Sequence, residues 1–329
     1  MRAAPAAVLA ALVAAGCGGA ARQAGPEGHI EAGASFAQGG PDQIAFDRAG
    51  SLYGVDCQDS WIFRVDSGGR LWIVGGTGEQ GFTGNGGSAA EAQFTCPAGI
   101  ALDAVGNVFV ADHDNRVRWI DRRGVVHAFA GAGAIPPLDS HAGSFGGDGG
   151  PARGAHLRAP TDLAFDPHGN LYISDSGNDA VRRIDSEGTV TTVARLVQPS
   201  GLAFDAHGAL YVATPHGIER VAKGSMTLFA RIAHPDGLAF DAHGDLYVAQ
   251  PLANVVRRID RRGTIAIVAG TGRPGEAGDG GPAVRARLTT PETVAVDGRG
   301  DLYIGDQGSG AIRKVDARGT ITTFFSGRS

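Results

Sequence analysis

One phrase recurs six times along this chain of 329 residues. It begins with proline and continues through an apolar run, a D-x-x-G turn and a second apolar run. The copies open at Pro41, Pro97, Pro160, Pro199, Pro235 and Pro291. The fourth and fifth copies, PSGLAFDAHGALYVAT and PDGLAFDAHGDLYVAQ, are nearly identical. Recurrence at this spacing predicts one structural unit stacked repeatedly, because a single unit of this size cannot bury its own apolar faces.

Each unit has the sequence features of four short strands. LYISD and VRRID alternate apolar with polar residues, which places the two kinds of side chain on opposite faces of a strand. The turns, such as Asp166 to Gly169, combine an aspartate that hydrogen-bonds its own backbone with a glycine that tolerates positive φ. The 53 glycines and 16 prolines also suit many tight turns. We therefore predict an all-β, six-bladed β-propeller of four-stranded antiparallel blades.

The pattern PxGhAhDxxGxhYhxD followed by hRhhD resembles the NHL repeat, and it extends from Pro41 to Ser329. The resemblance implies a six-bladed propeller, a fold that serves hydrolases, lyases and binding modules alike, so it does not settle activity. Blade four departs from the pattern, because Thr214 replaces the aspartate that ends the second strand. We expect the ring to close without strand exchange, and residues 29–37 to add an edge strand.

The first residues, MRAAPAAVLAALVAAGC, have one arginine, a short apolar stretch and small residues before cysteine. This is typical of a signal peptide and is too short to span a bilayer as a helix. The ending AAGC resembles the lipobox of bacterial lipoproteins, which implies that residues 1–17 are the signal region and that Cys17 is lipidated. Ala14 stands where such boxes carry a larger aliphatic residue, so cleavage by the ordinary signal peptidase is the alternative. Residues 18–40 have the composition of a flexible tether, and residues 41–329 form the propeller.

Net charge and cysteine positions limit the partners and the compartment. The net charge of −5 comes from well-mixed acidic and basic residues, so no basic field is available for nucleic acid. Cys57 ends the second strand of blade one and Cys96 precedes the first strand of blade two, which places both on one face. In an exported protein we predict that they form a disulfide, closing a loop of about 40 residues and stabilising by about 3 to 4 kcal/mol. Two free buried thiols are the alternative.

Three long glycine-rich connections precede Pro97, Pro160 and Pro291. In the propeller they lie on the face that also carries the loops between the second and third strands. A phosphate-binding loop is the first alternative for such a stretch, but no G-K-[ST] follows. We predict a structural turn leading into one short helix, with Asp148 or Asp279 near its start and Pro151 or Pro282 in its first turn.

The residue after each blade-opening proline should face the mouth of the central channel on that same side. Around the ring these residues are Asp42, Ala98, Thr161, Ser200, Asp236 and Glu292. Blades five, six and one are neighbours in a closed ring, so three carboxylates converge. Such a group raises its own pKa values or recruits a cation, and its oxygens suit Ca²⁺ or another hard divalent ion.

The segment PDGLAFDAHG is similar to a strand opening in the gluconolactonase and senescence-marker family. That resemblance implies a metal-ligand role for Asp236, which Asp42 matches by position only. The alternative is that PDG is simply a favourable turn, in which aspartate accepts backbone hydrogen bonds before glycine. We predict Asp42, Asp236 and Glu292 as the ligands of any bound cation.

Other polar residues on this face are weaker candidates. The predicted ligand face also includes Thr161, Ser200, Asp112, His113, His216 and His234. The histidines lack the close spacing of a zinc site, and the absence of channel histidines separates the chain from the amidating lyases that its repeats resemble. We expect the strand-ending aspartates to accept hydrogen bonds from the following loop. We expect Arg118, Arg182, Arg257 and Arg313 to form exposed ladders with acidic neighbours, worth a few tenths of a kcal/mol each.

The sequence thus supports two functions. The leading hypothesis is a monomeric, exported binding module, lipid-anchored or periplasmic, whose long-loop face binds a protein or glycan at the cell envelope. It contacts the membrane only through its anchor and needs no cofactor. The alternative is a metal-dependent, lactonase-like hydrolase that uses the three carboxylates to hold a divalent cation and activate water.

Overall fold

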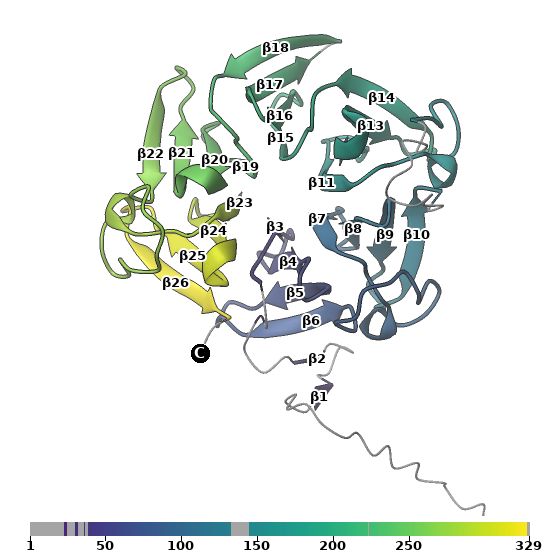
Figure 1. Cartoon of the computed structure of the whole chain (residues 1–329), viewed down its shortest axis with the longest axis horizontal. Coiled ribbons are helices and arrows are strands. Elements are labelled where there is room, and N and C mark those ends of the chain that lie inside the picture. The colour runs from purple at the N-terminus through teal and green to yellow at the C-terminus, as the bar shows by residue number, and fades with distance from the viewer. Residues whose placement is uncertain are drawn as a thin grey trace, which may run out of the picture.

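The computed structural model describes residues 23–24, 30–31, 36, 39–132, 145–222 and 224–327. Six small antiparallel sheets stand in a ring around a central axis (Figure 1). Every sheet contains four consecutive strands, and the first sheet has two further short strands at its outer edge. The chain is therefore a six-bladed β-propeller. Each blade keeps its own four strands, including blade four, so the ring closes without strand exchange as predicted.

The strands follow one another from the axis outward in every blade. Blade one consists of β3 (Gln43–Phe46), β4 (Leu52–Asp56), β5 (Trp61–Val65) and β6 (Leu71–Gly75). Blade two consists of β7 (Pro97–Leu102), β8 (Val108–Asp112), β9 (Arg116–Ile120) and β10 (Val126–Ala130). Blade three consists of β11 (Pro160–Phe165), β12 (Leu171–Asp175), β13 (Ala180–Ile184) and β14 (Val190–Arg195).

The second half repeats this order. Blade four consists of β15 (Leu202–Phe204), β16 (Leu210–Thr214), β17 (Gly217–Ala222) and β18 (Ser225–Ala230). Blade five consists of β19 (Leu238–Phe240), β20 (Leu246–Gln250), β21 (Val255–Ile259) and β22 (Ile265–Ala269). Blade six consists of β23 (Pro291–Val296), β24 (Leu302–Asp306), β25 (Ala311–Val315) and β26 (Ile321–Ser326).

Neighbouring blades pack through the apolar faces of their inner strands. At four seams the ring of a tyrosine or phenylalanine in the second strand meets a phenylalanine at the end of the next blade's first strand, with centroids 4.9 to 5.1 Å apart. These pairs are Phe46 with Tyr303, Phe109 with Phe165, Tyr172 with Phe204, and Tyr211 with Phe240. Edge-to-face contacts of this kind add to the area that the rings bury, so the phrase itself supplies the core.

The long glycine-rich connections contribute residues to that core. In the described residues each has a 3-10 turn, namely η1 (Ala89–Glu91), η2 (Ala152–Gly154) and η5 (Ala283–Arg285). The alanines and the large apolar residue of each A-x-x-A-x-F/L pattern are buried: Ala89, Ala92, Phe94, Ala152, Ala155, Leu157, Ala283, Ala286 and Leu288. The predicted short helix is present, with the proline just before it at the N-cap and not within its first turn.

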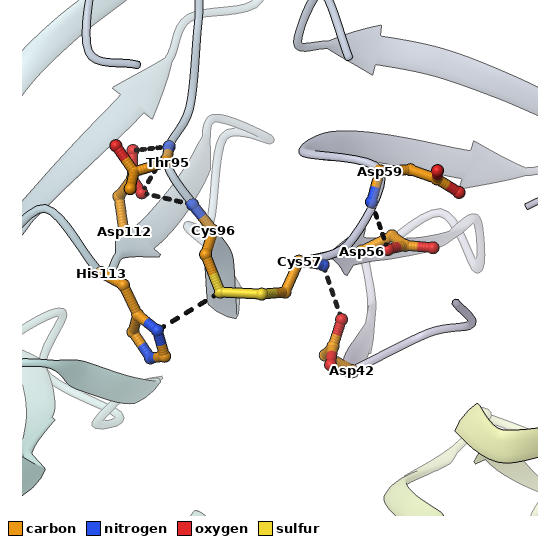
Figure 2. The surroundings of a disulfide bond; sticks show 8 residues. All are labelled: Asp42, Asp56, Cys57, Asp59, Thr95, Cys96, Asp112 and His113. Carbon is orange, nitrogen blue, oxygen red and sulfur yellow. Dashed lines mark hydrogen bonds between the residues drawn. A yellow bond between two sulfur atoms is a disulfide. The ribbon is translucent and has the colours of Figure 1, made fainter. Parts of the chain in front are cut away.

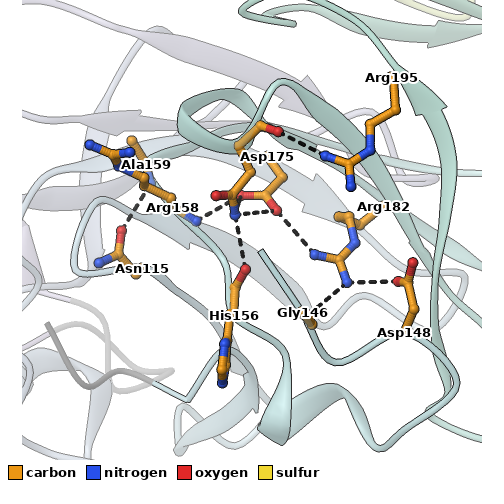
Figure 3. Close-up of polar contacts among 10 residues, drawn as sticks. Asn115, Gly146, Asp148, His156, Arg158, Ala159, Asp175, Arg182 and Arg195 are labelled. Atoms are coloured by element: carbon orange, nitrogen blue, oxygen red, sulfur yellow. Dashed lines mark hydrogen bonds and ion pairs between the residues drawn. The ribbon is translucent and has the colours of Figure 1, made fainter. Parts of the chain in front are cut away.

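Three arginines of the third strands hold these connections in place. Arg182 is completely buried and donates to Asp148 Oδ1 at 2.8 Å, to the Gly146 carbonyl at 3.0 Å and to Asp175 Oδ2 at 3.2 Å (Figure 3). Arg118 donates to the carbonyls of two connection residues at 2.6 and 2.7 Å, and Arg313 pairs with Asp279. The prediction that these arginines form exposed ladders was wrong for Arg118, Arg182 and Arg313. Each of the three side chains is buried and reaches backbone carbonyl groups of the adjoining connection.

Most of the predictions for the N-terminal segment concern residues outside the described ranges. Residues 1–17, with the predicted lipidation site Cys17, are among those not described. In the predicted tether, β2 (Ile30–Glu31) pairs with β6 at the outer edge of blade one and with β1 (Gln23–Ala24), which confirms the expected edge strand. Phe36 is 3% exposed, and its ring centroid lies 5.2 Å from that of Phe63 and 5.4 Å from that of Phe325. Within the described ranges, no helix has the length and apolar character needed to cross a bilayer.

Candidate functional site

The first strands of blades five, six and one bring three carboxyl groups together at the axis. Glu292 is hydrogen-bonded to Asp42 through their side chains, and Asp236 interacts electrostatically with both. The Gly237 amide donates to the Glu292 carbonyl at 2.8 Å, which joins blade five to blade six beside the cluster. Ring closure brings these groups together. Asp42 belongs to the first repeat and Glu292 to the sixth, 250 positions later in the sequence.

Burial sets the protonation of this cluster. It raises the pKa of Asp42 and of Asp236 to about 6, and it raises the pKa of Glu292 to about 8 with added repulsion from the two aspartates. Asp42 stays more acidic than Glu292 because the Cys57 amide donates to its Oδ2 at 2.6 Å. Near neutral pH Glu292 therefore keeps its proton and donates it in the hydrogen bond to ionised Asp42.

A polar bridge crosses the bore next to these carboxyls. Gln43 Nε2 donates to Asp162 Oδ1 at 2.6 Å, and Gln43 Oε1 accepts from the Thr293 hydroxyl. Asp162 also accepts the Leu202 amide at 2.7 Å, and burial raises its pKa to about 7. The bridge thus links blades six, one, three and four around the axis.

The bridging residues occupy the third position of the repeated phrase, which the sequence analysis did not select. That position reads Gln43, Gly99, Asp162, Gly201, Gly237 and Thr293 around the ring. The glycines allow close approach, because a Cβ at Gly99 would lie 2.7 Å from the Thr161 carbonyl and one at Gly201 would lie 2.2 Å from that of Asp236. The available signal was that this one repeat position holds glycine in three blades and a polar residue in the other three.

A small cavity of about 210 Å³ adjoins the cluster between blades four and five. Three predicted residues line it, namely Ser200, His234 and Asp236, and the Ser200 side chain hydrogen-bonds to Asp236. The remaining wall is formed by Gln198, Pro215, Pro235, Pro251 and Leu252. Leu252 is 76% exposed at the entrance. The cavity therefore combines an acidic wall with an apolar rim.

The other predicted ligand-face residues do not join this cavity. Thr161 donates its hydroxyl to the Pro199 carbonyl at 3.1 Å and so ties blade three to blade four. His216 is exposed in the loop after β16, and His113 is exposed beside Cys96, with Nδ1 at 3.3 Å from Sγ. Asp112 is fully buried and accepts the amides of Thr95 and Cys96. These four residues act within the fold or at its surface, apart from the carboxyl cluster.

The strand-ending aspartates accept backbone hydrogen bonds, but mostly from a segment that we did not predict. Asp112, Asp175 and Asp306 accept the amides of Thr95, Arg158 and Thr289, each two residues before a blade-opening proline. Only Asp56 follows the prediction, with the Asp59 amide of the next loop at 2.9 Å. The reason is antiparallel pairing, which puts the end of the second strand beside the approach to the first.

A disulfide joins Cys57 to Cys96 across the seam between blades one and two (Figure 2). The Cys57 amide donates to Asp42, and the Cys96 amide donates to Asp112 at 3.1 Å. The bond therefore fixes one edge of the carboxyl cluster. Figure 2 shows Asp42 and the His113 ring on opposite sides of the two sulfur atoms.

The carboxyl donors are of the right chemical type for a hard cation. Yet within the described ranges no group of three His, Cys, Asp or Glu side chains is arranged to hold a metal ion. The hydrogen bond between Glu292 and Asp42 also occupies oxygens that a cation would need. In this arrangement the cluster binds a proton, and a cation would have to displace it.

The chain is similar in sequence to parts of much longer proteins. A family model described as Teneurin NHL domain matches residues 64–136 and 272–329. Human teneurin-4 is 30% identical over 263 residues, which are 74% of this chain and 9% of that protein. Mouse teneurin-1 is 27% identical over 289 residues, 80% of this chain and 10% of that protein. The chain thus spans about a tenth of the length of these curated relatives.

Solved structures share the fold at low sequence identity. A gluconolactonase from Xanthomonas campestris has a TM-score of 0.58 at 18% identity, over 85% of this chain and 87% of that one. Virginiamycin B lyase from Staphylococcus aureus has a TM-score of 0.55 at 17% identity, and the match covers 86% of this chain and 83% of that one. An auxiliary nutrient binding protein from Bacteroides thetaiotaomicron has a TM-score of 0.61 at 15% identity, and the match covers 86% of this chain and 69% of that one. Together with the repeats, these comparisons show that the chain is an NHL-repeat six-bladed β-propeller.

Proposed function

We propose that this NHL-repeat propeller is an exported binding module that holds a basic group of a protein partner at the mouth of its axis. The observation that carries the proposal is the group of four carboxyls, Asp42, Asp162, Asp236 and Glu292, gathered where the blades meet. Among the described residues, none of the ion pairs includes any of the four. Buried carboxyls without a basic partner favour a ligand that brings the positive charge with it.

The adjacent cavity supports a lysine or arginine side chain over a glycan as the bound group. Its prolines and Leu252 form an apolar rim, and Asp236 lies on its wall. A long basic side chain matches that combination, because its methylene stem packs on apolar surface while its charge reaches the carboxylate. The disulfide between Cys57 and Cys96 supports export, since such bonds persist in oxidising compartments.

Calorimetric titration with a lysine-rich peptide tests the proposal. The triple variant Asp42→Asn, Asp236→Asn and Glu292→Gln removes the acidic groups at the mouth. The matched control, Glu91→Gln, Glu187→Gln and Glu276→Gln, neutralises three exposed acids elsewhere. We expect the first variant to lower affinity at least tenfold and the control to bind like the parent protein. Equal affinities for all three proteins would refute a basic ligand at the mouth.

A metal-dependent hydrolase is the second candidate, favoured by the contact between Asp42 and Glu292 and by the shared fold with a gluconolactonase. In that case Asp42, Asp236 and Glu292 hold a divalent cation such as Ca²⁺, whose chemistry is to activate a bound water. Elemental analysis and titration with CaCl₂ separate the two candidates. One bound cation per chain, lost in the triple variant and accompanied by lactone hydrolysis, selects the enzyme; no bound cation removes it.

A further inference from the structure

A second cavity opens far from the mouth, between blades one and two. It has a volume of about 760 Å³ and is lined by the turns after β3, β7 and β9, which lie at the opposite end of the strands from the carboxyl cluster. Pockets of roughly 300 to 1,000 Å³ suit small organic ligands. The seam between blades one and two has Leu102 where four other seams place the phenylalanine of an aromatic pair, and Tyr53 lines the cavity.

Comparison of the blades identifies an unusual cation in this cavity. Arg64 is the fourth residue of β5 and lies opposite Tyr53 of β4. In three other blades the corresponding basic residue binds the residue just before the second strand: Arg258 with Asp245 at 3.6 Å, Lys314 with Asp301 at 2.7 Å, and Arg183 with Asn170 at 3.2 Å. In blade four that position is Ala209, and Arg220 donates to the Tyr211 hydroxyl at 3.1 Å. In blade one that position is Ser51, whose side chain is too short to reach a guanidinium in the same way.

Among the described residues, Arg64 forms no ion pair with an acidic side chain. Its Nε is buried without a hydrogen bond, as are those of Arg182, Arg183 and Arg313, but these three arginines pair through their other nitrogens. Buried polar groups are normally hydrogen-bonded, and an exception calls for an explanation. What distinguishes Arg64 is that its guanidinium lies in the wall of a cavity large enough for a ligand, so an anionic ligand can supply the partner.

The acidic residues of the cavity are engaged in their own turns. Asp47 accepts the Ser51 amide at 2.8 Å, Asp103 accepts the Asn107 amide and side chain, and Asp121 accepts the Val125 amide and contacts Arg123. Two further guanidiniums, of Arg48 and Arg122, lie at the entrance, and the inner wall includes Val74, Val108 and Ile120. Arg64 therefore lies in a wall that also presents apolar surface to the cavity.

We propose that this cavity binds a small organic carboxylate, whose anionic group pairs with Arg64 and whose apolar body packs against the valines and isoleucine. The fork of an arginine matches a carboxylate geometrically and gives a charge-assisted hydrogen bond. The site is independent of the mouth, and each can fail without the other. It makes blade one a ligand-binding blade, whereas blades five and six fill the same place with their own aspartates.

Benzoate serves as the probe, followed by NMR titration of the full chain, with benzamide as its neutral isostere. We expect saturable benzoate binding, no binding of benzamide, and an affinity at least tenfold lower for Arg64→Ala, as removal of a charge-assisted bond implies. Arg258→Ala, the equivalent change in blade five, is the control and should leave benzoate affinity unchanged. Absence of benzoate binding, or equal losses in the two variants, would overturn the site.

The variant Ser51→Asp distinguishes a specific loss of ligand binding from a loss caused by unfolding. It places in blade one the residue that blades five and six already have at this position, so the new carboxylate should pair with Arg64 and exclude the ligand. We expect loss of benzoate binding with a thermal midpoint equal to or above that of the parent chain. Retained benzoate affinity in a folded Ser51→Asp protein would contradict the role of Arg64.

Discussion

At the scale of single residues, the chain places several carboxyls where water is scarce. Asp56, Asp112, Asp162 and Glu292 all have pKa values raised to between about 7 and about 8, with desolvation as the main cause. Hydrogen bonds from backbone amides offset part of the free-energy cost of desolvating the charged carboxylate. At Asp112 the amides of Thr95 and Cys96 donate to the carboxylate. The carboxyls of Asp42 and Glu292 share one proton instead, because two adjacent charges cannot both be stabilised there.

The raised pKa of Glu292 makes folding stability depend on pH. The unfolded chain loses this proton near pH 4.5, whereas the folded chain holds it to about pH 8. Between these values the folded state binds more protons, so stability falls as pH rises, by up to about 1.4 kcal/mol per pH unit for each such group.

We expect the parent chain to melt at a higher temperature at pH 5.5 than at pH 8.5. Glu292→Gln, which is neutral at every pH, should flatten this slope, and Glu187→Gln on the surface should not. Calorimetry across this range checks both statements. A melting temperature that rises with pH in the parent chain would contradict the buried, protonated Glu292.

At the scale of elements, the glycine-rich connections behave as extensions of the blades. Each adds a short antiparallel contact to the first residue of an outer strand, as between Gly86 and Val126, Gly149 and Val190, or Gly280 and Ile321. The arginine of the third strand then holds the connection from inside. Repetition of this design in blades two, three and six indicates that the described parts of these segments stabilise the blades.

Arg182→Ala should destabilise the protein by about 3 kcal/mol, because it leaves Asp175 and Asp148 without their buried partner. Arg257→Ala is the comparison, since Arg257 is half-buried and, among the described residues, donates to the neutral side chain of Gln250 and forms no ion pair. We expect a loss there of about 1 kcal/mol. Urea unfolding measures both. Equal losses would show that the connection does not depend on the arginine.

The disulfide acts between elements of two blades. Replacing Cys57 and Cys96 together by serine opens a loop with a sequence separation of 39 residues, which the chain-entropy model values at about 4 kcal/mol. We expect a lower urea midpoint and weaker binding of the lysine-rich peptide, since the Cys57 amide orients Asp42. The parent protein in a reducing agent should behave in the same way. An unchanged midpoint in both samples would indicate that the bond is absent in solution.

At the scale of the whole molecule, closure of the ring depends on an aromatic residue upstream of the repeats. Phe36 packs between Phe63 of blade one and Phe325 of blade six and belongs to the cluster that joins these blades. No strand is exchanged between the two blades. The first and last blades are thus held by side-chain packing, by the hydrogen bond of Thr293 with Gln43, and by the pair Asp42 and Glu292.

Phe36→Ala should lower the free energy of unfolding by about 3 to 5 kcal/mol, the usual loss for a buried phenylalanine. Phe82→Ala is the control, because Phe82 is 57% exposed. Chemical unfolding with both variants provides the measurement. A loss at Phe36 no larger than at Phe82 would mean that the residue does not contribute to closure.

The sequence by itself determined the unit, its number and its strand order. Local physics is enough for that, since alternation, D-x-x-G turns and the recurring proline act within a few residues of one another. It also indicated that Asp42, Asp236 and Glu292 meet. These residues open blades one, five and six, which are neighbours once a ring of six blades closes. The strand-ending aspartates were correctly assigned as backbone acceptors, although most of their donors come from a different segment.

Only the tertiary structure decided what crosses the axis and which charges remain unpaired. The bridge from Thr293 through Gln43 to Asp162 joins residues of three blades, and no local pattern encodes a contact across the ring. The burial of Arg182 and its relatives depends on how a connection folds back, which glycine-rich composition leaves open. The surroundings of Arg64 were also decided by the tertiary structure. They are recognised by comparing the contacts of corresponding residues in different blades. The physical reason is that ion pairing depends on neighbours in space and not on spacing along the chain.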